Sequence, residues 1–252
     1  MTKLKDRVAI VTGAQRGIGL AIAERFAAEG AKLVVVDLND ASGEIDALRA
    51  RGHDAAFVRA DVSREADVAH AVERTLALHG RIDILVNNAG IEFAKTVVDT
   101  TVEEWDRLMA VNLRGAFLCA RAVIPPMRKQ GKGNIINIAS ELGLVGEANV
   151  AAYCASKGGV VMLSKAMAID HGREGIRINC LCPGPVTTQL FEDVLTSRDD
   201  PQGLRRRFEA ATVLGRLGRP EEVAAAAAFL ASDDSAFMAG ADLVVDGGWT
   251  AR

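Results

Sequence analysis

The fold is decided by a stretch near the start of the chain, Val8-Ala9-Ile10-Val11-Thr12-Gly13-Ala14-Gln15-Arg16-Gly17-Ile18-Gly19. Its first five residues are apolar or β-branched, which is typical of a buried parallel strand. A helix-like segment follows over residues 20–29, so the glycines lie in a strand-to-helix turn. Glycines allow close backbone approach there, and a helix N-terminus offers free N–H groups to a phosphate. The turn predicts a nucleotide site, although its spacing is wider than Gly-x-Gly-x-x-Gly and a glycine turn without a ligand is the simpler alternative.

Strand-like and helix-like segments alternate along the rest of the chain. Strands are predicted over residues 32–37, 55–60, 82–86, 134–139, 177–181 and 243–245, and helices over 41–51, 64–79, 101–124, 151–171 and from 219. Pro125-Pro126 is expected to weaken the fourth of the chain's helices near its end. This alternation predicts an α/β fold with a doubly wound parallel sheet of about seven strands and helices on both faces. With no linker and no repeat, residues 1–252 are expected to form a single domain with a substrate-loop region near 188–215.

Composition excludes several classes of protein. The 252 residues are 49% hydrophobic and carry a net charge of −3, which predicts a sizeable core and no nucleic-acid surface. The N-terminus lacks a signal peptide, and the most apolar run, 223–231, is too short to cross a membrane. We therefore expect a soluble cytoplasmic protein. Cys180 and Cys182 share one face of a strand without a nearby His, so no metal site is expected.

Two charged side chains bear on the nucleotide. Asp37 ends the second predicted strand, where an acid can hydrogen-bond a ribose diol and repel a 2′-phosphate, and this favours NAD. Arg16 in the glycine turn could instead pair with that phosphate and favour NADP. We weight Asp37 more heavily and expect NAD. The Arg16 side chain can turn outward, whereas the repulsion between the Asp37 carboxylate and a 2′-phosphate is harder to avoid.

Tyr153 and Lys157 are four residues apart in the predicted helix 151–171, and Tyr153 is the only tyrosine. That spacing puts both side chains on one helix face. A neighbouring ammonium favours the phenolate and should lower the pKa of Tyr153, as proton exchange with an alcohol or carbonyl oxygen requires. Taken alone, such a pair is more often a pair of surface side chains.

Together these residues resemble the short-chain dehydrogenase/reductase family. The resemblance extends over about residues 8–248 and rests on Thr12-Gly13-x-x-x-Gly17-Ile18-Gly19, Asp61, Asn87-Asn88-Ala89-Gly90, Asn112, Ser140, Tyr153-x-x-x-Lys157, and Pro183-Gly184 with Thr188. It implies a Rossmann-type domain that assembles as a homotetramer through two long helices and the C-terminal region.

The resemblance also implies roles for these positions. Tyr153 would exchange the proton, Ser140 would hydrogen-bond the substrate oxygen, Lys157 would tune Tyr153 and bind the nicotinamide ribose, and Asn112 would hold a water that links Lys157 to solvent. The implied cofactor contacts are Gly13, Arg16, Gly17, Ile18, Gly19, Asp37, Asp61, Val62, Asn88, Ala89, Gly90, Tyr153, Lys157, Pro183, Gly184, Val186 and Thr188, with Ile91 as a further neighbour.

The substrate pocket is expected to include Ser140, Leu142 and Tyr153. By analogy it would also draw on Glu92, Phe93, Glu141, Val145, Val150, Trp249 and the region 189–214, of which the segment after Thr188 is either a lid or an ordinary packed helix pair. This mixture of apolar and acidic side chains suits a secondary alcohol or ketone of moderate size.

Three functions are compatible with the sequence. The leading hypothesis is an NAD-linked oxidoreductase that transfers a hydride between the cofactor and a secondary alcohol or ketone. The second is an NADPH-linked reductase of 3-oxoacyl thioesters, which would use Arg16 for the phosphate and a basic patch of Arg128, Lys129 and Arg173 for an acyl carrier protein. The third is a non-catalytic nucleotide sensor on the same fold.

Overall fold

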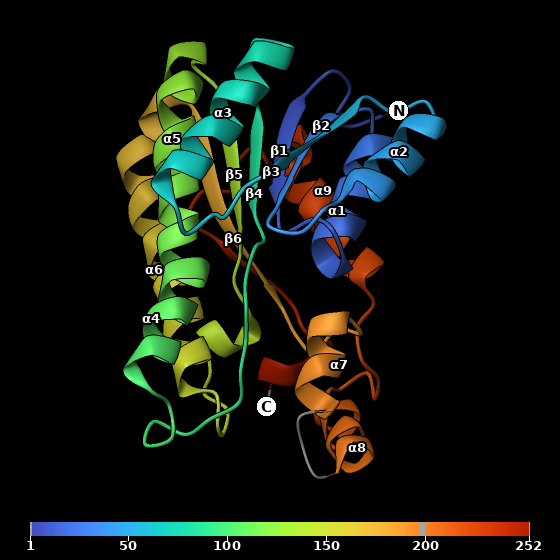
Figure 1. The fold of residues 1–252 in the computed structure, drawn as a ribbon, viewed down its shortest axis with the longest axis vertical. Coiled ribbons are helices and arrows are strands. Elements are labelled where there is room, and N and C mark those ends of the chain that lie inside the picture. The colour runs from blue at the N-terminus through green and yellow to red at the C-terminus, as the bar shows by residue number, and fades with distance from the viewer. Residues whose placement is uncertain (1, 197–199, 252) are drawn as a thin grey trace.

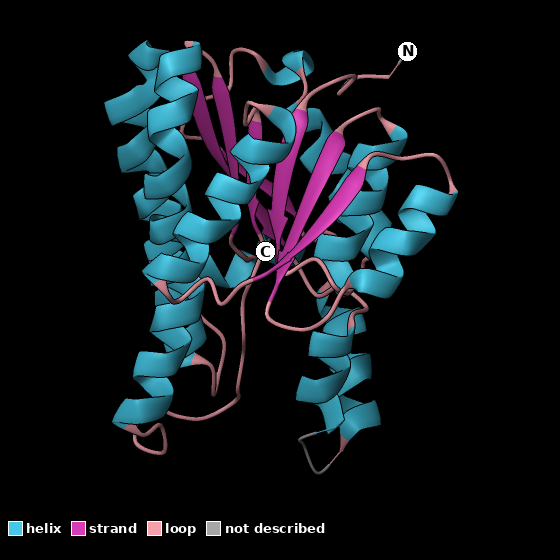
Figure 2. Cartoon of the chain, turned by 45° about the horizontal axis from the view of Figure 1, so that its top comes forward, coloured by secondary structure: helices cyan, strands magenta, loops and turns pink. Residues whose placement is uncertain are grey.

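The structure, a computed structural model, describes residues 2–196 and 200–251. Its centre is a seven-stranded parallel sheet with the order β3-β2-β1-β4-β5-β6-β7 (Figures 1 and 2). The strands are β1 Val8–Thr12, β2 Lys32–Asp37, β3 Ala55–Arg59, β4 Ile84–Asn87, β5 Gly133–Ile138, β6 Ile176–Pro183 and β7 Asp242–Val245. The predicted strands are all present, and their ends shift by no more than two residues because neighbouring strands set where pairing stops.

Helices cover both faces of the sheet, so the predicted doubly wound, Rossmann-like α/β fold is confirmed. They are α1 Gly17–Ala28, α2 Ser42–Ala50, α3 Glu65–His79, α4 Val102–Met109, α5 Gly115–Gln130, α6 Ala151–His171, α7 Gln189–Thr196, α8 Pro201–Ala211 and α9 Pro220–Ala231. In Figure 1, α1, α2 and α9 lie on one side of the sheet and α3, α5 and α6 on the other. The connection after β3 crosses from one side to the other, which leaves a crevice at the carboxyl ends of β1 and β4.

The long helix before β5 differs from the prediction. It runs without interruption through Pro125 and Pro126 to Gln130, where Gly131 ends it with a left-handed backbone. The prolines lie toward its outer side, Pro125 exposed and Pro126 half-buried, so water can satisfy the carbonyls that they leave free. Val123, Ile124 and Met127 are buried on the inner side and hold the helix to the sheet.

The helical run 102–130 is long and apolar enough to cross a membrane by length and composition alone, and it is the one such run among the described residues. Half of its most apolar part is buried inside the protein, where it packs on α3 and α6. Core helices of soluble proteins share these properties, so the run gives only weak evidence for a membrane segment.

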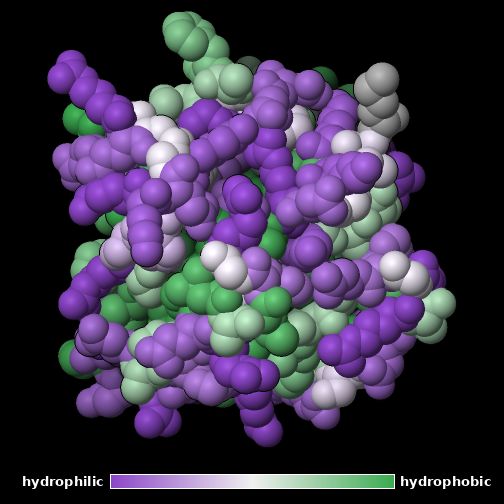
Figure 3. Space-filling view, turned by 90° about the horizontal axis from the view of Figure 1, so that it is seen from above, coloured by the Kyte–Doolittle hydropathy of each residue, from purple (hydrophilic) through white to green (hydrophobic). Residues whose placement is uncertain are grey.

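The two ends of the molecule differ in structure. Helices α7 and α8 pack against each other and extend past the carboxyl ends of the strands, in orange in Figure 1. Figure 3 shows the end away from them, where hydrophilic side chains predominate and apolar ones gather in smaller patches.

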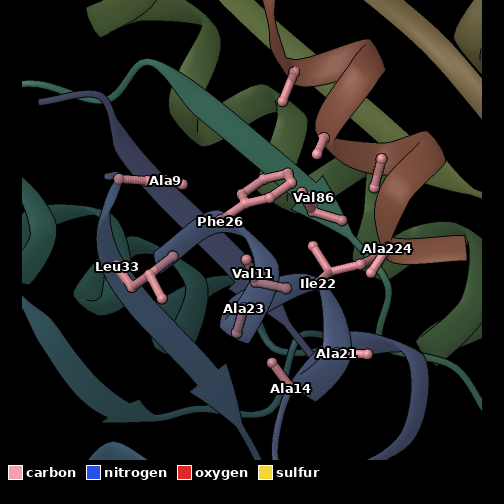
Figure 4. Packing of buried hydrophobic residues seen from close by; sticks show 14 of the residues in the cluster. Ala9, Val11, Ala14, Ala21, Ile22, Ala23, Phe26, Leu33, Val86 and Ala224 are labelled. Atoms are coloured by element: carbon pink, nitrogen blue, oxygen red, sulfur yellow. The ribbon is translucent and has the colours of Figure 1, made fainter. Parts of the chain in front are cut away.

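The core under α1 is built around Phe26. Its side chain is fully buried among the alanines of α1, residues of β1 and β4, and α9 (Figure 4). Small residues on both helices let α1 and α9 approach closely, and the ring fills the space that remains between them and the sheet.

We expect Phe26→Ala to lower the free energy of unfolding by about 3–5 kcal/mol, because it leaves a large cavity in a close-packed core. Urea denaturation measures this value. Phe237→Ala is the control, since the Phe237 ring is fully exposed and its loss should change stability by less than about 0.5 kcal/mol. A similar loss in both variants would contradict this account of the core.

Candidate active site

Two adjoining cavities lie at the carboxyl ends of the strands. The larger, of about 510 Å³, extends from the glycine turn along the ends of β2 and β3, and the smaller, of about 140 Å³, lies in front of Tyr153. Both are lined by Ile18, Asn88, Gly90, Thr188 and Leu190. An elongated ligand in the larger cavity can therefore reach a small molecule in the other.

The glycine turn and the loop after β4 are locked together by hydrogen bonds. Thr12 Oγ1 accepts from the backbone N–H groups of Asn88 at 3.0 Å and Ala89 at 3.1 Å. The Asn88 side chain donates to the carbonyls of Thr12 at 3.0 Å and Gly13 at 2.8 Å. These contacts fix the floor that the two cavities share.

Glycine is required at two places in this floor. A Cβ on Gly13 would lie 2.6 Å from Ala89 Cα, and Gly13 also has a φ of +64°. A Cβ on Gly19 would lie 2.2 Å from the Gly13 carbonyl oxygen. No side chain caps the N-terminus of α1, so its first N–H groups face the turn with the positive end of the helix dipole.

The predicted adenosine side of the site comes together in the larger cavity. Asp37, Asp61 and Val62 line it together with Gly13, Arg16, Gly17, Asn88, Ala89 and Gly90. The Asp37 carboxylate accepts from Gln15 N at 3.0 Å and Asn39 N at 2.9 Å, which holds it at the end of β2. The Arg16 guanidinium is directed toward Asp193 of α7, at 3.8 Å.

The end of β6 and the loop after it line the smaller cavity with Pro183, Gly184, Val186 and Thr188. All four are among the cofactor contacts that the resemblance implies. Gly184 N donates to Val245 O at 3.0 Å, and a Cβ on Gly184 would lie 2.6 Å from Asp246 Cα, so strand β7 fixes this loop. Thr188 Oγ1 accepts from Phe191 N at 3.2 Å and holds the start of α7.

Tyr153, Lys157 and Ser140 meet in the smaller cavity. Tyr153 and Lys157 occupy the first two turns of α6, and Lys157 Nζ lies 5.6 Å from the centre of the Tyr153 ring. Lys157 Nζ donates to Ile138 O at 2.9 Å at the end of β5. Ser140 Oγ accepts from Leu142 N at 3.1 Å and donates to Glu141 Oε2 at 2.5 Å.

The pKa values here differ from the expectation that Lys157 lowers the pKa of Tyr153. Burial raises the pKa of Tyr153 well above that of a free phenol, the charges of Glu92 and Glu141 raise it further, and a hydrogen bond with Ser140 lowers it. Burial also lowers the pKa of Lys157 to about 8, against the opposing charge of Glu92. Loss of solvation is the largest cause of the rise in the Tyr153 pKa and the two carboxyl groups add to it, whereas the Lys157 ammonium lies over the ring and donates to a carbonyl.

Asn112 lies behind the cavities and lines neither of them. It is the centre of a π-helical turn, Ala110–Arg114, that turns its side chain into the interior. Its Oδ1 accepts from Ile91 N at 2.8 Å, and its Nδ2 donates to Ile91 O at 2.9 Å and Ser156 Oγ at 3.1 Å. Asn112 therefore ties the loop after β4 to α6, and its predicted contact with a water stays a prediction.

Helices α7 and α8 supply part of the apolar wall of the smaller cavity, and the sequence located this part only to the region 188–215. The lining residues that it did not single out are Ile138, Ala139 and Pro185 and, on the two helices, Leu190, Phe191, Val194 and Phe208. Their apolar spacing on two short amphipathic helices was the available signal. Residues 197–199 of the predicted region lie outside the described residues.

The other predicted pocket residues divide into two groups. Glu92, Glu141 and Leu142 line the cavity, and Val150 lines a neighbouring one, whereas Phe93 and Val145 line neither. Trp249 does not line the cavity but stacks on Phe208, with ring centres 5.3 Å apart, and Phe208 meets Phe191 edge-on at 5.2 Å. The C-terminus thus supports the wall from behind.

Several residues of the larger cavity were missed as well. Leu38, Ser63, Arg107 and Val111 line it, and Leu38 could have been found because it directly follows Asp37 at the strand end.

Within residues 2–196 and 200–251, His, Cys, Asp and Glu form no group of three that could hold a metal ion.

Comparison with known proteins agrees with this geometry, in which a glycine turn lies at the switch point of a Rossmann-like sheet. A family model described as "Enoyl-(Acyl carrier protein) reductase" matches residues 13–250. The chain is 44% identical over 254 residues to cyclopentanol dehydrogenase of Comamonas testosteroni, covering 100% of both chains. It is 42% identical over 250 residues to meso-2,3-butanediol dehydrogenase of Serratia marcescens, covering 99% of this chain and 96% of the relative.

Among solved structures, levodione reductase matches with a TM-score of 0.94 and 38% identity, over 99% of each chain. The fold and the glycine turn define the class of Rossmann-like nucleotide-binding folds. The chain belongs to the short-chain dehydrogenase/reductase family, as the sequence motifs predicted.

The Glu141 carboxyl gives a pH-dependent prediction. Burial raises its pKa from 4.5 to about 7, and the charge of Glu92 acts in the same direction, against the hydrogen bond from Ser140. Between pH 4.5 and pH 7 the unfolded chain loses this proton while the folded chain keeps it, so this group makes stability fall as the pH rises. We expect Glu141→Gln to gain up to about 3 kcal/mol relative to the natural chain between pH 4.5 and pH 8.

Chemical denaturation of both proteins across this pH range measures the difference. Glu103→Gln serves as control, because Glu103 is exposed and its substitution should shift stability equally at both ends of the range. A constant difference between Glu141→Gln and the natural chain would show that the folded protein does not hold this proton.

Proposed function

We propose that this protein catalyses the NAD(H)-linked interconversion of a secondary alcohol and the corresponding ketone, with Tyr153 as the proton-exchanging group. The observation that carries the proposal is the meeting of Tyr153, Ser140 and Lys157 in a small cavity that opens onto a larger one ending at Asp37. Relatives named for the oxidation of cyclopentanol and of butanediol support alcohol and ketone oxidoreduction.

The residues present fit a nicotinamide dinucleotide. A pyrophosphate would be held by the N-terminus of α1 and by the turn of Gly13, Gly17 and Gly19, where the backbone of Gly13 packs too closely on Ala89 to admit a Cβ. Asp61 and Val62 would flank the adenine, and Asn88, Ala89 and Gly90 would line the ribose next to Lys157. When bound, the cofactor supplies the hydride acceptor or donor for the carbinol carbon.

NAD rather than NADP is favoured by Asp37. Its carboxylate is held at the end of β2 by two backbone N–H groups and lines the cavity where a ribose would lie. Arg16, the cation that could neutralise a 2′-phosphate, is directed toward Asp193 instead. A phosphate beside Asp37 would meet a like charge at close range.

The side chains of the smaller cavity have separate roles in the proton exchange. Tyr153 would give a proton to the carbonyl oxygen or take it from the alcohol, and Ser140 would donate a hydrogen bond to the same oxygen. The buried Lys157 would bind the nicotinamide ribose, because a Cβ built on Gly90 would lie only 3.6 Å from its Nζ. Asn112 would position this group from behind through Ile91 and Ser156.

The carrier-protein alternative is less well supported. Arg128 pairs with Glu174 at 2.9 Å, so one of the three cations of the expected basic patch is neutralised. The end of α5 also lies where β5 begins, whereas the cavities lie at the carboxyl ends of the strands. A protein docked on that patch would therefore lie at the end of the sheet away from Tyr153. A non-catalytic sensor would have no need of the complete set Asn112, Ser140, Tyr153 and Lys157.

The proposed protein is cytoplasmic. Each chain forms a single domain, and four identical chains assemble into a homotetramer. Exposed apolar side chains on α4, α5 and α6 support assembly through the long helices, among them Trp105, Phe117, Met162 and Ile169.

Tyr153→Phe tests the proton-exchange role. We expect kcat for an alcohol with NAD⁺ to fall by about 10²–10⁴-fold, because the hydroxyl is lost from an otherwise unchanged ring. NADH should still bind, and nicotinamide absorbance and fluorescence measure turnover and binding. Retained turnover would exclude Tyr153 as the proton-exchanging group.

Asp37→Asn tests the choice of cofactor. Removal of the carboxylate charge should shift the ratio of kcat/KM with NAD⁺ to kcat/KM with NADP⁺ by at least about tenfold toward NADP⁺. Asp40→Asn, an exposed acid three residues further along the chain, should leave the ratio unchanged. An unchanged ratio in both variants would mean that Asp37 does not select the cofactor.

A further inference from the structure

Helix α7 is held against the glycine turn by two contacts. Thr188, which precedes α7, lies against Gly17, where a Cβ built on the glycine would lie 3.6 Å from Cβ and Cγ2 of Thr188. Further along α7, Asp193 Oδ2 lies 3.8 Å from Arg16 Nη2. The start of α7 therefore lies beside the start of α1, as Figure 1 shows.

A hydrogen bond within α7 gives the Asp193 carboxylate its direction. Gln189 Nε2, one helical turn earlier, donates to Asp193 Oδ1 at 2.8 Å, and the other oxygen of the carboxylate faces Arg16. Gln189 and Arg16 both line the larger cavity, together with Asp37. The Arg16 guanidinium is thus drawn toward α7 within the cavity where the ribose of a dinucleotide would lie.

Two anions compete for the Arg16 side chain. One is the Asp193 carboxylate, and the other would be the 2′-phosphate of NADP beside Asp37, which is held at the end of β2. A guanidinium pairs well with a carboxylate or with a phosphate, so a contact with one of them has to be given up for the other. Asp193 therefore acts against the phosphorylated cofactor without touching it.

The same ion pair bears on the substrate cavity. Leu190, Phe191 and Val194 of α7 line the smaller cavity, so whatever fixes α7 also fixes this part of its wall. A cofactor that takes Arg16 away from Asp193 would remove one of the two contacts of α7 with the glycine turn. Binding of the alcohol and binding of the 2′-phosphate are then coupled, with opposite preferences for this ion pair.

We propose, on the basis of the function proposed above, that Asp193 is a positioning residue that acts through Arg16. It disfavours NADP by holding Arg16 away from the 2′-phosphate, and it couples the choice of cofactor to the affinity for the alcohol. With NAD the ion pair stays intact and α7 is held to the glycine turn. With NADP the phosphate takes Arg16, and the wall of the smaller cavity is held less firmly.

The test uses two variants that break the same ion pair from opposite sides. Asp193→Asn leaves Arg16 to the phosphate, so the KM for NADP⁺ should fall by about threefold to fivefold, as one exposed ion pair allows. Arg16→Gln removes the cation, so the KM for NADP⁺ should rise by a similar factor. The KM for NAD⁺ should change by less than about twofold in both, and nicotinamide absorbance measures all of these values.

The KM for the alcohol is the second readout. In the natural protein we expect it to be about threefold higher with NADP⁺ than with NAD⁺. Asp193→Asn should raise the value with NAD⁺ to the value with NADP⁺, while kcat changes by less than about twofold. The same KM for the alcohol with both cofactors in the natural protein would contradict the coupling.

Glu192→Gln is the matched control. It removes the same charge from the neighbouring position of α7, where Glu192 pairs with Arg205 of α8. It should leave the KM for NADP⁺ unchanged, which separates the ion pair with Arg16 from a general loss of negative charge. The proposal is wrong if Glu192→Gln acts as strongly as Asp193→Asn, or if Asp193→Asn and Arg16→Gln shift the KM for NADP⁺ in the same direction.

Binding of NADPH without an alcohol separates this inference from the proposed function. Fluorescence titration should give a dissociation constant about threefold to fivefold lower for Asp193→Asn than for the natural protein. The same difference is expected between Asp37→Asn and Asp37→Asn/Asp193→Asn, in which the repulsion by Asp37 is absent. Tighter NADPH binding without turnover of any alcohol would overturn the proposed function alone. Turnover of an alcohol with NADPH binding that does not depend on Asp193 would overturn this inference alone.

Discussion

The contact between Thr12 and Asn88 is the constraint on which the site depends. One hydroxyl accepts two backbone N–H groups from the loop after β4, and one amide donates back to two carbonyls of the glycine turn. Each bond is modest by itself, but together they join two loops that are 75 residues apart in sequence. Glycine at position 13 follows from this contact, because the joined backbones leave no room for a Cβ.

Burial has opposite consequences at the two ends of the site. Around the glycine turn it costs little, because the Thr12 hydroxyl and the Asn88 amide pair with the backbone groups that approach there. Around Tyr153 it changes the acid–base chemistry, since a phenol, an ammonium and two carboxyls share a poorly solvated space. The charges of Glu92 and Glu141 act on the pKa values of both Tyr153 and Lys157, so these groups titrate in dependence on their neighbours. A polar substrate that enters this group alters that balance as well as filling space.

The sequence predicted the fold, and most of the residues that it singled out around the glycine turn line the larger cavity, because both rest on local patterns. A buried β-branched run, a glycine turn and an acid at a strand end each indicate their structure within a few residues, as β1, Gly13 and Asp37 illustrate. Pro125 and Pro126 were misjudged because helix continuity there is decided by which side of the helix faces the core. The pKa of Tyr153 was misjudged for a related reason, since Glu92 and Glu141 reach it from elements far from α6 in sequence.

The substrate side was the least predictable part because two different kinds of contact form it. Helices α7 and α8 meet the C-terminus through the rings of Phe191, Phe208 and Trp249, and through an ion pair between Arg205 and Glu192. Packing of this kind is non-directional and tolerates substitution, so it selects a substrate by size but not by functional group. Ser140 and Glu141, in contrast, follow the central strand β5, where a hydrogen bond joins their side chains. Size selectivity is therefore expected from the helices α7 and α8, and the polar side chains that follow β5 bear on the reacting group.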